Sequence, residues 1–261
     1  MIKTGDETPL KRDVALETPT GSSRSFGSDV VDLDYGRPAD EQIAAAVKAA
    51  ILSMQLPPGQ LISEKEVGRM FGASRTPVRA AFAQLREEGL LVTWPSRGTF
   101  VTNLSLKEIR SAQFLREGIE TTVVKHLCAE GVLEQHQAAL EKNMADQKSA
   151  AEGGDHASFH LLDDQFHSLL IQATGFARVD AALGREKAVL DRLRSLELAT
   201  EGAMERLRSD HAMILKAVKA GDTAAAVEAL QAHARLALGT LSGLIEKHRG
   251  YFDLDETSED I

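Results

Sequence analysis

The chain has 261 residues, of which 43% are apolar and 26% charged, a globular composition compatible with one large domain or two ordinary ones. Aromatic residues make up only 5%, which favours helices over a β-sandwich or barrel. No apolar stretch approaches the roughly 18 residues of a membrane helix, the N-terminus lacks a secretory h-region, and the lone Cys128 excludes an internal disulfide framework. We therefore expect a cytoplasmic protein with no membrane partner.

The net charge of −9 is unevenly distributed along the chain. Residues 37–103 carry eight basic and six acidic side chains, whereas residues 1–36 and the last eleven residues are acidic. A local basic face is enough to bind a polyanion, so the overall acidity does not exclude a nucleic-acid partner.

Residues 1–36 mix Thr, Ser, Gly, Asp and Pro without apolar periodicity, which predicts a mostly disordered arm. Three short helices follow, and then two β-like runs, 90–94 and 99–102, on either side of a turn-rich tip. This order predicts a winged helix-turn-helix over residues 37–103. The predicted helix limits are Asp40 and Pro57 for the first helix, Ser63 and Gly72 for the second, and Ser74 and Gly89 for the third.

The third helix is predicted to present arginines to DNA. At 100° per residue, Arg75, Arg79 and Arg86 fall within about 40° of one another, and a planar guanidinium can bond guanine O6 and N7 together. Lys65 and Arg97 could add phosphate or minor-groove contacts. The alternative is a solvated arginine stripe on an ordinary surface helix.

After Asn103 the pattern changes to long helices broken at glycines, which predicts an all-α antiparallel bundle over residues 104–249. An acidic tail, residues 250–261, is expected to fray. The expected helices cover 105–129, 132–151, 156–173, 177–199, 203–220 and 222–248.

Polar residues interrupt the apolar stripes of three of these helices. His211 and His233 lie ten residues before and eleven after the Gly221-Asp222 turn, which places them at nearly equal heights in a helical hairpin. Asp163 and His167 are four apart on one helix face. Together they form an O/N/N/N set suited to a divalent transition metal such as Zn, Ni or Mn. For any single histidine, a hydrogen-bonded core residue is the alternative.

Three arginines of the helical half are candidates for anion binding. Arg116 lies on an apolar row and needs an anionic partner, either the carboxylate of a small effector or Glu120 four residues on. Arg192 and Arg194 are candidate pocket residues, although a solvated helix face is the favoured interpretation for both.

The N-terminal half resembles the GntR family of bacterial transcription regulators. The resemblance rests on residues 61–79 (LISEKEVGRMFGASRTPVR), 85–90 (LREEGL) and 95–101 (PSRGTFV), and it covers about 40–103. It implies operator contacts by Lys65, Arg75, Arg79 and the wing residue Gly98, where a missing Cβ allows close approach to the DNA backbone. The same predicted interface includes Ser74, Thr76 and Arg97.

The helical half looks like the FCD domain of the FadR subfamily, in FLREGIE (114–120), DDQFH (163–167) and the segments around His211 and His233. The resemblance implies that Asp163, His167, His211 and His233 bind the metal and that Arg116 helps to hold an organic acid. Gly175-Phe176 replaces a Gly-Asn pair that is common in the family.

The sequence therefore predicts a homodimeric, ligand-responsive regulator, expected to be a repressor, that binds palindromic operator DNA. A small carboxylate effector would bind beside the metal, and no catalytic residues are expected. The alternatives are a metal-dependent hydrolase and a regulator whose metal site is purely structural.

Overall fold

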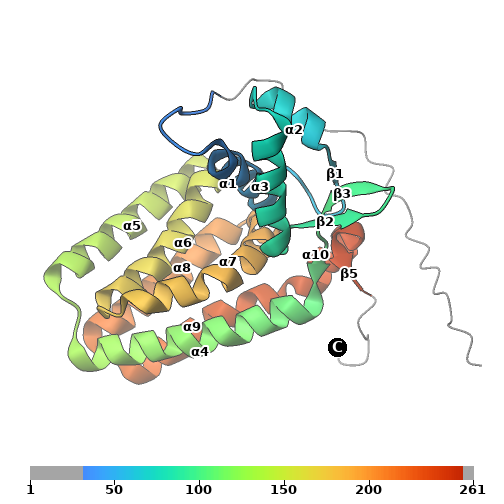
Figure 1. Ribbon diagram of the computed structural model, residues 1–261. Helices are drawn as coiled ribbons and strands as arrows, with labels where there is room; N and C mark the ends of the chain where they lie inside the picture. Colours follow the sequence, from blue (N-terminus) through green and yellow to red (C-terminus); the bar gives the residue numbers. More distant parts are fainter. Residues whose placement is uncertain (1–31, 255–261) are drawn as a thin grey trace, which may run out of the picture.

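The computed structural model describes residues 32–254 apart from the side chain of Arg185. Its N-terminal half is the expected winged helix-turn-helix (Figure 1). Ser63 begins the second helix by accepting a hydrogen bond from the Glu66 N–H, whereas the Ser74 side chain makes no capping bond. The elements are α1 (Ala39–Leu52), α2 (Glu64–Met70), α3 (Arg75–Glu87), β2 (Leu91–Trp94) and β3 (Gly98–Val101). Their shared core includes the fully buried Ile43, Val47, Val78, Phe82 and Leu85.

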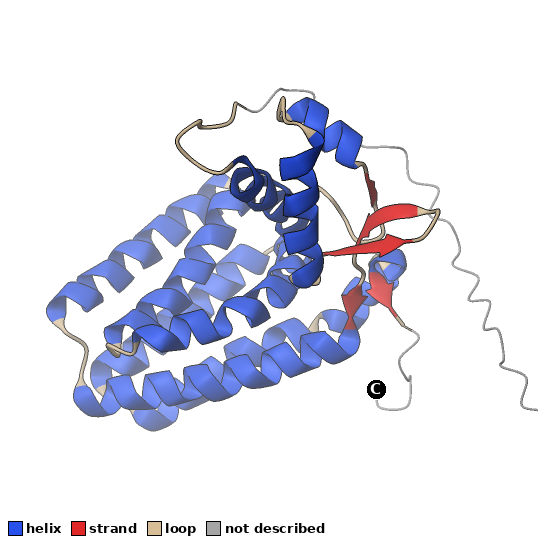
Figure 2. Ribbon diagram, in the orientation of Figure 1, coloured by secondary structure: helices blue, strands red, loops and turns tan. Residues whose placement is uncertain are grey.

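The wing has one strand more than the predicted hairpin. β1 (Leu61–Ile62) pairs antiparallel with β3, which gives the sheet order β1-β3-β2 (Figure 2). Two residues are too few to show an alternating pattern, so only pairing across the sheet reveals this strand.

The C-terminal half is the expected helical bundle, and its first five helices begin and end within two residues of the expected limits. The α8–α9 hairpin turns at Gly221, which adopts the left-handed conformation that glycine tolerates best. The bundle helices are α4 (Leu106–Glu130), α5 (Glu134–Gly153), α6 (His156–Ala173), α7 (Ala177–Leu198), α8 (Ala203–Ala220) and α9 (Thr223–Gly239).

The prediction of a single helix over 222–248 is wrong. α9 ends at Gly239, and a separate helix, α10 (Leu241–Lys247), follows Thr240. The Thr240 hydroxyl donates to the Ala237 carbonyl oxygen at 3.2 Å. Such a local side-chain bond competes with the helical ladder, which helps to explain the break.

The expected fraying from residue 250 is also wrong as far as residue 254. A 3₁₀ turn (Arg249–Tyr251) leads into β5 (Phe252–Asp253), which pairs in parallel with β4 (Leu104–Ser105). Phe252 is only 4% exposed, so burial of its ring anchors this segment against the start of α4. Residues 255–261 lie outside the described residues.

The predicted disordered arm falls mostly outside the described part, which begins at residue 32. Residues 34–37 are bound to α1, because the Gln42 side chain accepts from the Asp34 N–H and donates to the carbonyl oxygens of Asp34 and Arg37. Between residues 32 and 254, no helix has the length and apolar character needed to cross a membrane.

Candidate nucleic-acid interface and metal centre

The front of α3 presents two unpaired arginines to solvent. Arg75 and Arg79 are exposed, and within residues 32–254 neither side chain forms a hydrogen bond or an ion pair. Arg86 differs, because its Nη1 lies 3.5 Å from the Thr93 hydroxyl on β2. The predicted stripe therefore divides into two free guanidinium groups and one that contacts the wing.

The other residues predicted to touch DNA are also exposed. Ser74 and Thr76 flank Arg75 at the start of α3, and Lys65 lies in the first turn of α2. Arg97 and Gly98 are at the wing tip. Their assignment to a DNA interface stays a prediction.

Gly98 has a requirement within the fold itself. Its φ is +115°, a conformation that side-chain-bearing residues rarely adopt, and an added Cβ would lie 2.7 Å from Leu61 Cδ1. The wing therefore favours glycine here chiefly because of this φ, since the Leu61 side chain is exposed and its terminal methyl can move, and this holds whether or not DNA is bound.

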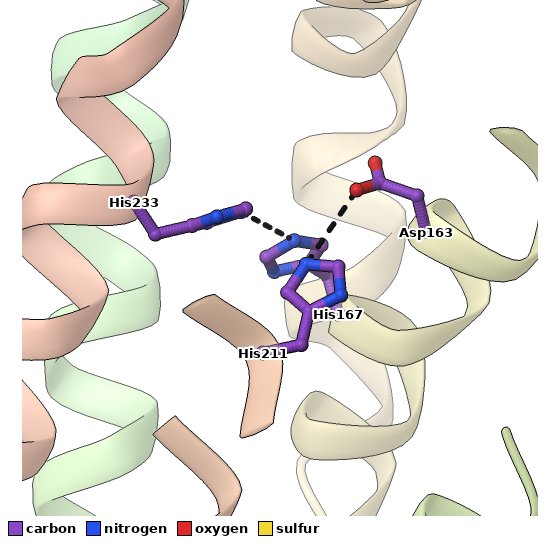
Figure 3. A group of neighbouring side chains, drawn as sticks. All are labelled: Asp163, His167, His211 and His233. Carbon is purple, nitrogen blue, oxygen red and sulfur yellow. Dashed lines mark hydrogen bonds and ion pairs between the residues drawn. The ribbon is translucent and has the colours of Figure 1, made fainter. Parts of the chain in front are cut away.

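Three helices bring the four predicted metal ligands together at the centre of the bundle. Asp163 and His167 come from α6, His211 from α8 and His233 from α9 (Figure 3). All four side chains are buried, and one ligand atom from each lies within 4.8 Å of the others. His167 Nε2 is 3.2 Å from His233 Nε2, and His211 Nε2 is 3.5 Å from Asp163 Oδ1. Ligands on a tetrahedral zinc ion are roughly 3.3 Å apart, so these separations suit a shared ion.

Each histidine faces an oxygen acceptor through its other ring nitrogen. His167 Nδ1 lies 3.1 Å from Glu120 Oε2, and His233 Nδ1 lies 3.5 Å from Asp210 Oδ2. His211 Nδ1 is 2.9 Å from Gln147 Oε1, whose amide nitrogen donates to Asn143. An acceptor at Nδ1 favours the proton there and leaves the Nε2 lone pair for a metal, as outer partners of metal-bound histidines do.

The electrostatics keep two of the three imidazoles, those of His211 and His233, neutral and the Asp163 carboxylate ionised. Burial lowers the pKa of His233 to about 4, and burial together with the neighbouring His233 lowers the pKa of His211 well below its usual value. Burial by itself would raise the pKa of Asp163, but the charge of the Arg194 guanidinium is the strongest opposing influence, and the pKa is lowered. Neutral imidazoles and an ionised carboxylate are the protonation states that metal binding requires.

Four buried atoms of the cluster lack a hydrogen-bond partner within residues 32–254. They are His211 Nε2, Asp163 Oδ1, His167 Nδ1 and His233 Nδ1, and leaving such groups unsatisfied is costly in a protein interior. The two Nδ1 atoms lie near carboxylates without hydrogen-bond geometry, whereas His211 Nε2 and Asp163 Oδ1 face each other inside the cluster. Phe166 stacks on the His211 ring with centroids 4.2 Å apart, which holds the ring plane in place. The donor set therefore fits a divalent metal ion.

Arg116 pairs with Glu120 and also lines a small cavity beside the cluster. Its Nε lies 2.7 Å from Glu120 Oε1, the intrahelical pair that was the alternative interpretation. It also lines a cavity of about 20 Å³ beside Asp163, bordered by Gln113, Lys187 and Asp191. A space of this size holds a water molecule, so an organic acid would require these side chains to rearrange.

The solvated interpretation of Arg192 and Arg194 is wrong, because both are buried. Arg194 Nε lies 3.4 Å from Asp163 Oδ2, and its Nη1 donates to Glu197 Oε2 at 3.0 Å. Arg194 therefore contacts a predicted metal ligand and lines the cavity with Arg116.

Sequence reasoning missed the acceptors behind the histidines. Gln147 lies on a buried row of α5 with Leu140, Asn143 and Ala150, and an inward polar residue on an apolar row is the signal that identified the histidines. Glu120 was considered only as a partner of Arg116. The five remaining histidines, His126, His136, His156, His160 and His248, lie outside the cluster.

Comparisons with known proteins agree with this architecture. Residues 39–101 match the family described as bacterial regulatory proteins, gntR family, and residues 113–236 match the FCD domain. The chain is 33% identical over 201 residues to the HTH-type transcriptional repressor RspR of Escherichia coli (strain K12), covering 77% of this chain and 88% of that protein.

Two solved structures share the fold. E. coli McbR/YncC aligns with a TM-score of 0.66 at 18% identity, over 80% of this chain and 98% of that one. A protein described as a GntR transcriptional regulator from Rhodococcus sp. RHA1 aligns with a TM-score of 0.65 at 23% identity, over 78% and 97% of the two chains.

Proposed function

Because this chain belongs to the gntR family of bacterial regulatory proteins, which makes it a DNA-binding transcriptional regulator and not an enzyme, we propose that it is a ligand-responsive repressor. In this proposal Asp163, His167, His211 and His233 hold a divalent metal, and a small organic acid binds beside it with the help of Arg116. The hydrolase alternative is set aside, since the family and the relatives are regulators.

The observation that carries the proposal is the buried donor cluster. Three imidazoles and one carboxylate converge with their Nε2 and Oδ1 atoms, while Glu120, Gln147 and Asp210 face the far side of the rings. A core that needed only stability would not place four polar residues at its centre with four of their atoms unsatisfied. Their arrangement supports a bound cation, which adds a positive charge for a carboxylate to approach.

The proposed DNA interface is the exposed front of α3 together with the wing. Arg75 and Arg79 would reach base edges in the major groove, with Ser74 and Thr76 beside them, and Lys65, Arg97 and Gly98 would lie against phosphates or the minor groove. Repression is favoured by the name of the E. coli relative, a transcriptional repressor. Palindromic half-sites follow from the proposed homodimer, in which two such domains bind about 34 Å apart.

The proposed division of labour keeps the limits predicted from the sequence except at the C-terminus, where residues 250–254 pack on the bundle. Residues 37–103 would bind DNA, and residues 104–249 would bind the metal and the effector and form the dimer. Because the proposed partner is operator DNA, we expect the protein to act in the cytoplasm.

The test is an operator gel shift in which the metal and the acid are varied separately. A duplex selected by the wild-type protein from a random pool is titrated after chelation and then with Zn²⁺, Ni²⁺ or Mn²⁺, each with panels of sugar acids, hydroxy acids and fatty acyl derivatives. Release of DNA by one acid only in the presence of metal supports the proposal. Binding that no acid changes, in a protein that holds metal, indicates a purely structural site instead.

The control is the double variant His211→Ala/His233→Ala beside His156→Ala, which changes an exposed histidine outside the cluster. The double variant should still bind the duplex and ignore the acid, whereas His156→Ala should respond like the wild type. An acid response that survives in the double variant would contradict the proposed site.

A further inference from the structure

Helix α7 lies against both halves of the molecule. It packs on α1 of the winged half and on α4 and α6 of the bundle, and in Figure 1 it passes beneath α1. One turn of α7 holds four polar residues, which are Asp191, Arg192, Arg194 and Ser195. Their contacts divide into two sets that point to different parts of the protein.

The first set faces the candidate metal centre. Asp191 and Arg194 line the cavity beside Asp163, and Arg194 Nε is 3.4 Å from Asp163 Oδ2. The Arg194 guanidinium is also held within α7 by Glu197. The Asp163–Arg194 pair is therefore a buried ionic contact between α6 and α7.

The second set faces the winged half. Arg192 Nη1 donates to the Thr102 carbonyl oxygen at 2.8 Å and lies 3.2 Å from the Thr102 hydroxyl. The Ser195 hydroxyl donates to the Leu52 carbonyl oxygen at 2.7 Å. Leu52 is the last residue of α1, and Thr102 directly follows β3, so these two bonds hold the winged half at two separate points.

Arg192 is buried to a degree that is unusual for an arginine whose contact is only structural. Its side chain is 3% exposed, and Thr102 is its one hydrogen-bonding partner within residues 32–254. Among the described residues no carboxylate forms an ion pair with it; burial lowers its pKa to about 10, and the charge of Glu108 offsets only part of that shift. Desolvating a cation for two bonds to one residue is costly, which suggests that the placement of Thr102 matters.

The chain is strained just after α1, where the winged half packs against the bundle. Met54 has a φ of +62°, a left-handed conformation that costs a residue with a side chain roughly 1–2 kcal/mol. Its side chain packs on the apolar cluster that contains Leu104, Leu190 and Leu193. The segment between α1 and β1 is therefore held in a conformation that the surrounding contacts impose.

We propose that α7 couples the metal and acid pocket to the placement of the winged half, with Arg192 and Ser195 as the positioning residues. The proposal rests on the proposed function and adds the contacts through which ligand binding in the bundle would reach the winged half. At 100° per residue, positions 191 and 194 lie on one face of α7 and positions 192 and 195 on the next, so a small rotation of the helix moves both sets of contacts. Helix shifts of about 1–2 Å are a common form of such transitions.

The test follows amide hydrogen exchange in the full chain with Zn²⁺ as the ligand. In the wild type, zinc should change exchange at least threefold both in α6 around Asp163 and at residues 52–56 and 102–105. In Arg192→Met, which keeps the apolar stem, and in Ser195→Ala, zinc should still bind and still protect α6. The change in exchange at residues 52–56 and 102–105 should fall to less than half of the wild-type change. Arg178→Met is the control, because Arg178 is exposed at the start of the same helix.

Two results would overturn the coupling. Either zinc protects α6 in the wild type and leaves residues 52–56 and 102–105 unchanged, or both variants transmit the zinc response in full. Should Arg192→Met not fold, Ser195→Ala, which removes one hydroxyl, decides alone. A wild-type protein that binds no zinc by calorimetry contradicts the proposed metal site separately. The positioning role is then tested without metal: unchanged exchange at residues 52–56 in Ser195→Ala, which loses the bond to the Leu52 carbonyl, overturns it.

Discussion

The winged half and the bundle use polar side chains in opposite ways. On α3, Arg75 and Arg79 extend into solvent without a partner in the described part of the chain. At the centre of the bundle, the polar ligand cluster is buried, and each histidine faces a second polar residue. An exposed arginine costs little stability and is free to find a ligand, whereas a buried polar cluster must be organised in advance. Substitutions on α3 should therefore affect DNA binding alone. Substitutions in the cluster should affect metal binding and the stability of the fold together.

The largest expected effect is on DNA binding. Arg79→Ala should weaken binding to the selected duplex by about 1–3 kcal/mol per half-site, because it removes a fork that bonds a base edge. The melting temperature should stay within one degree of the wild type. Gel shifts and calorimetry measure the two quantities, with Arg178→Ala as an exposed arginine of the bundle. Equal affinity for the two variants would remove Arg79 from the interface.

The bundle should lose stability in acid when metal is absent. The folded pKa of His233 is about 4, below the unfolded value of about 6.5. Between these values the unfolded chain binds a proton that the folded chain does not, so stability falls as pH decreases from about 6.5 to 4, by about 3 kcal/mol in total. Urea unfolding of chelated protein across this range measures it. A flat profile would show that the histidine is not held neutral by burial.

Metal should stabilise the wild type and not the variant with a broken cluster. At free zinc one hundred times the dissociation constant, the wild type should gain about 2.7 kcal/mol, and His211→Ala/His233→Ala should gain almost nothing. Thermal unfolding with and without zinc, together with metal analysis of the purified proteins, checks this. Full zinc occupancy of the double variant would place the metal elsewhere.

The wing offers a smaller effect on stability. Gly98→Ala should destabilise the protein by about 1–2 kcal/mol, because φ is +115° and the new Cβ would meet Leu61. Gly118→Ala, in the middle of α4 with open space around the added Cβ, should be neutral or slightly stabilising. If Gly98→Ala were equally harmless, the close approach of Leu61 would not constrain the wing.

The smallest expected effect is at Lys65. Replacing it by alanine should weaken binding by less than about 1 kcal/mol on every sequence and reduce the slope of log affinity against log salt by about one, as expected for a phosphate contact. A salt titration of wild type and Lys65→Ala measures both. A sequence-dependent loss would indicate a base contact instead.

Much of the site followed from local arithmetic on the sequence. His211 and His233 were predicted at equal heights from their distances to the Gly221 turn, and their ring centroids are 4.7 Å apart. The pairing of Asp163 with His167 followed from a spacing of four. Glu120 and Gln147 were not predicted to face these rings, because the facing of two helices depends on how the whole bundle packs.

The sequence by itself determined the order of the helices, the ends of all but the last one, and the polar residues that interrupt their apolar rows, since all of these depend on neighbours a few positions apart. Only the tertiary structure decided that β1 joins the wing, that β5 returns to β4, and that Arg192 reaches Thr102 ninety residues away. Such contacts leave no local periodicity, because each arises when distant segments are brought together by burial of the shared cores.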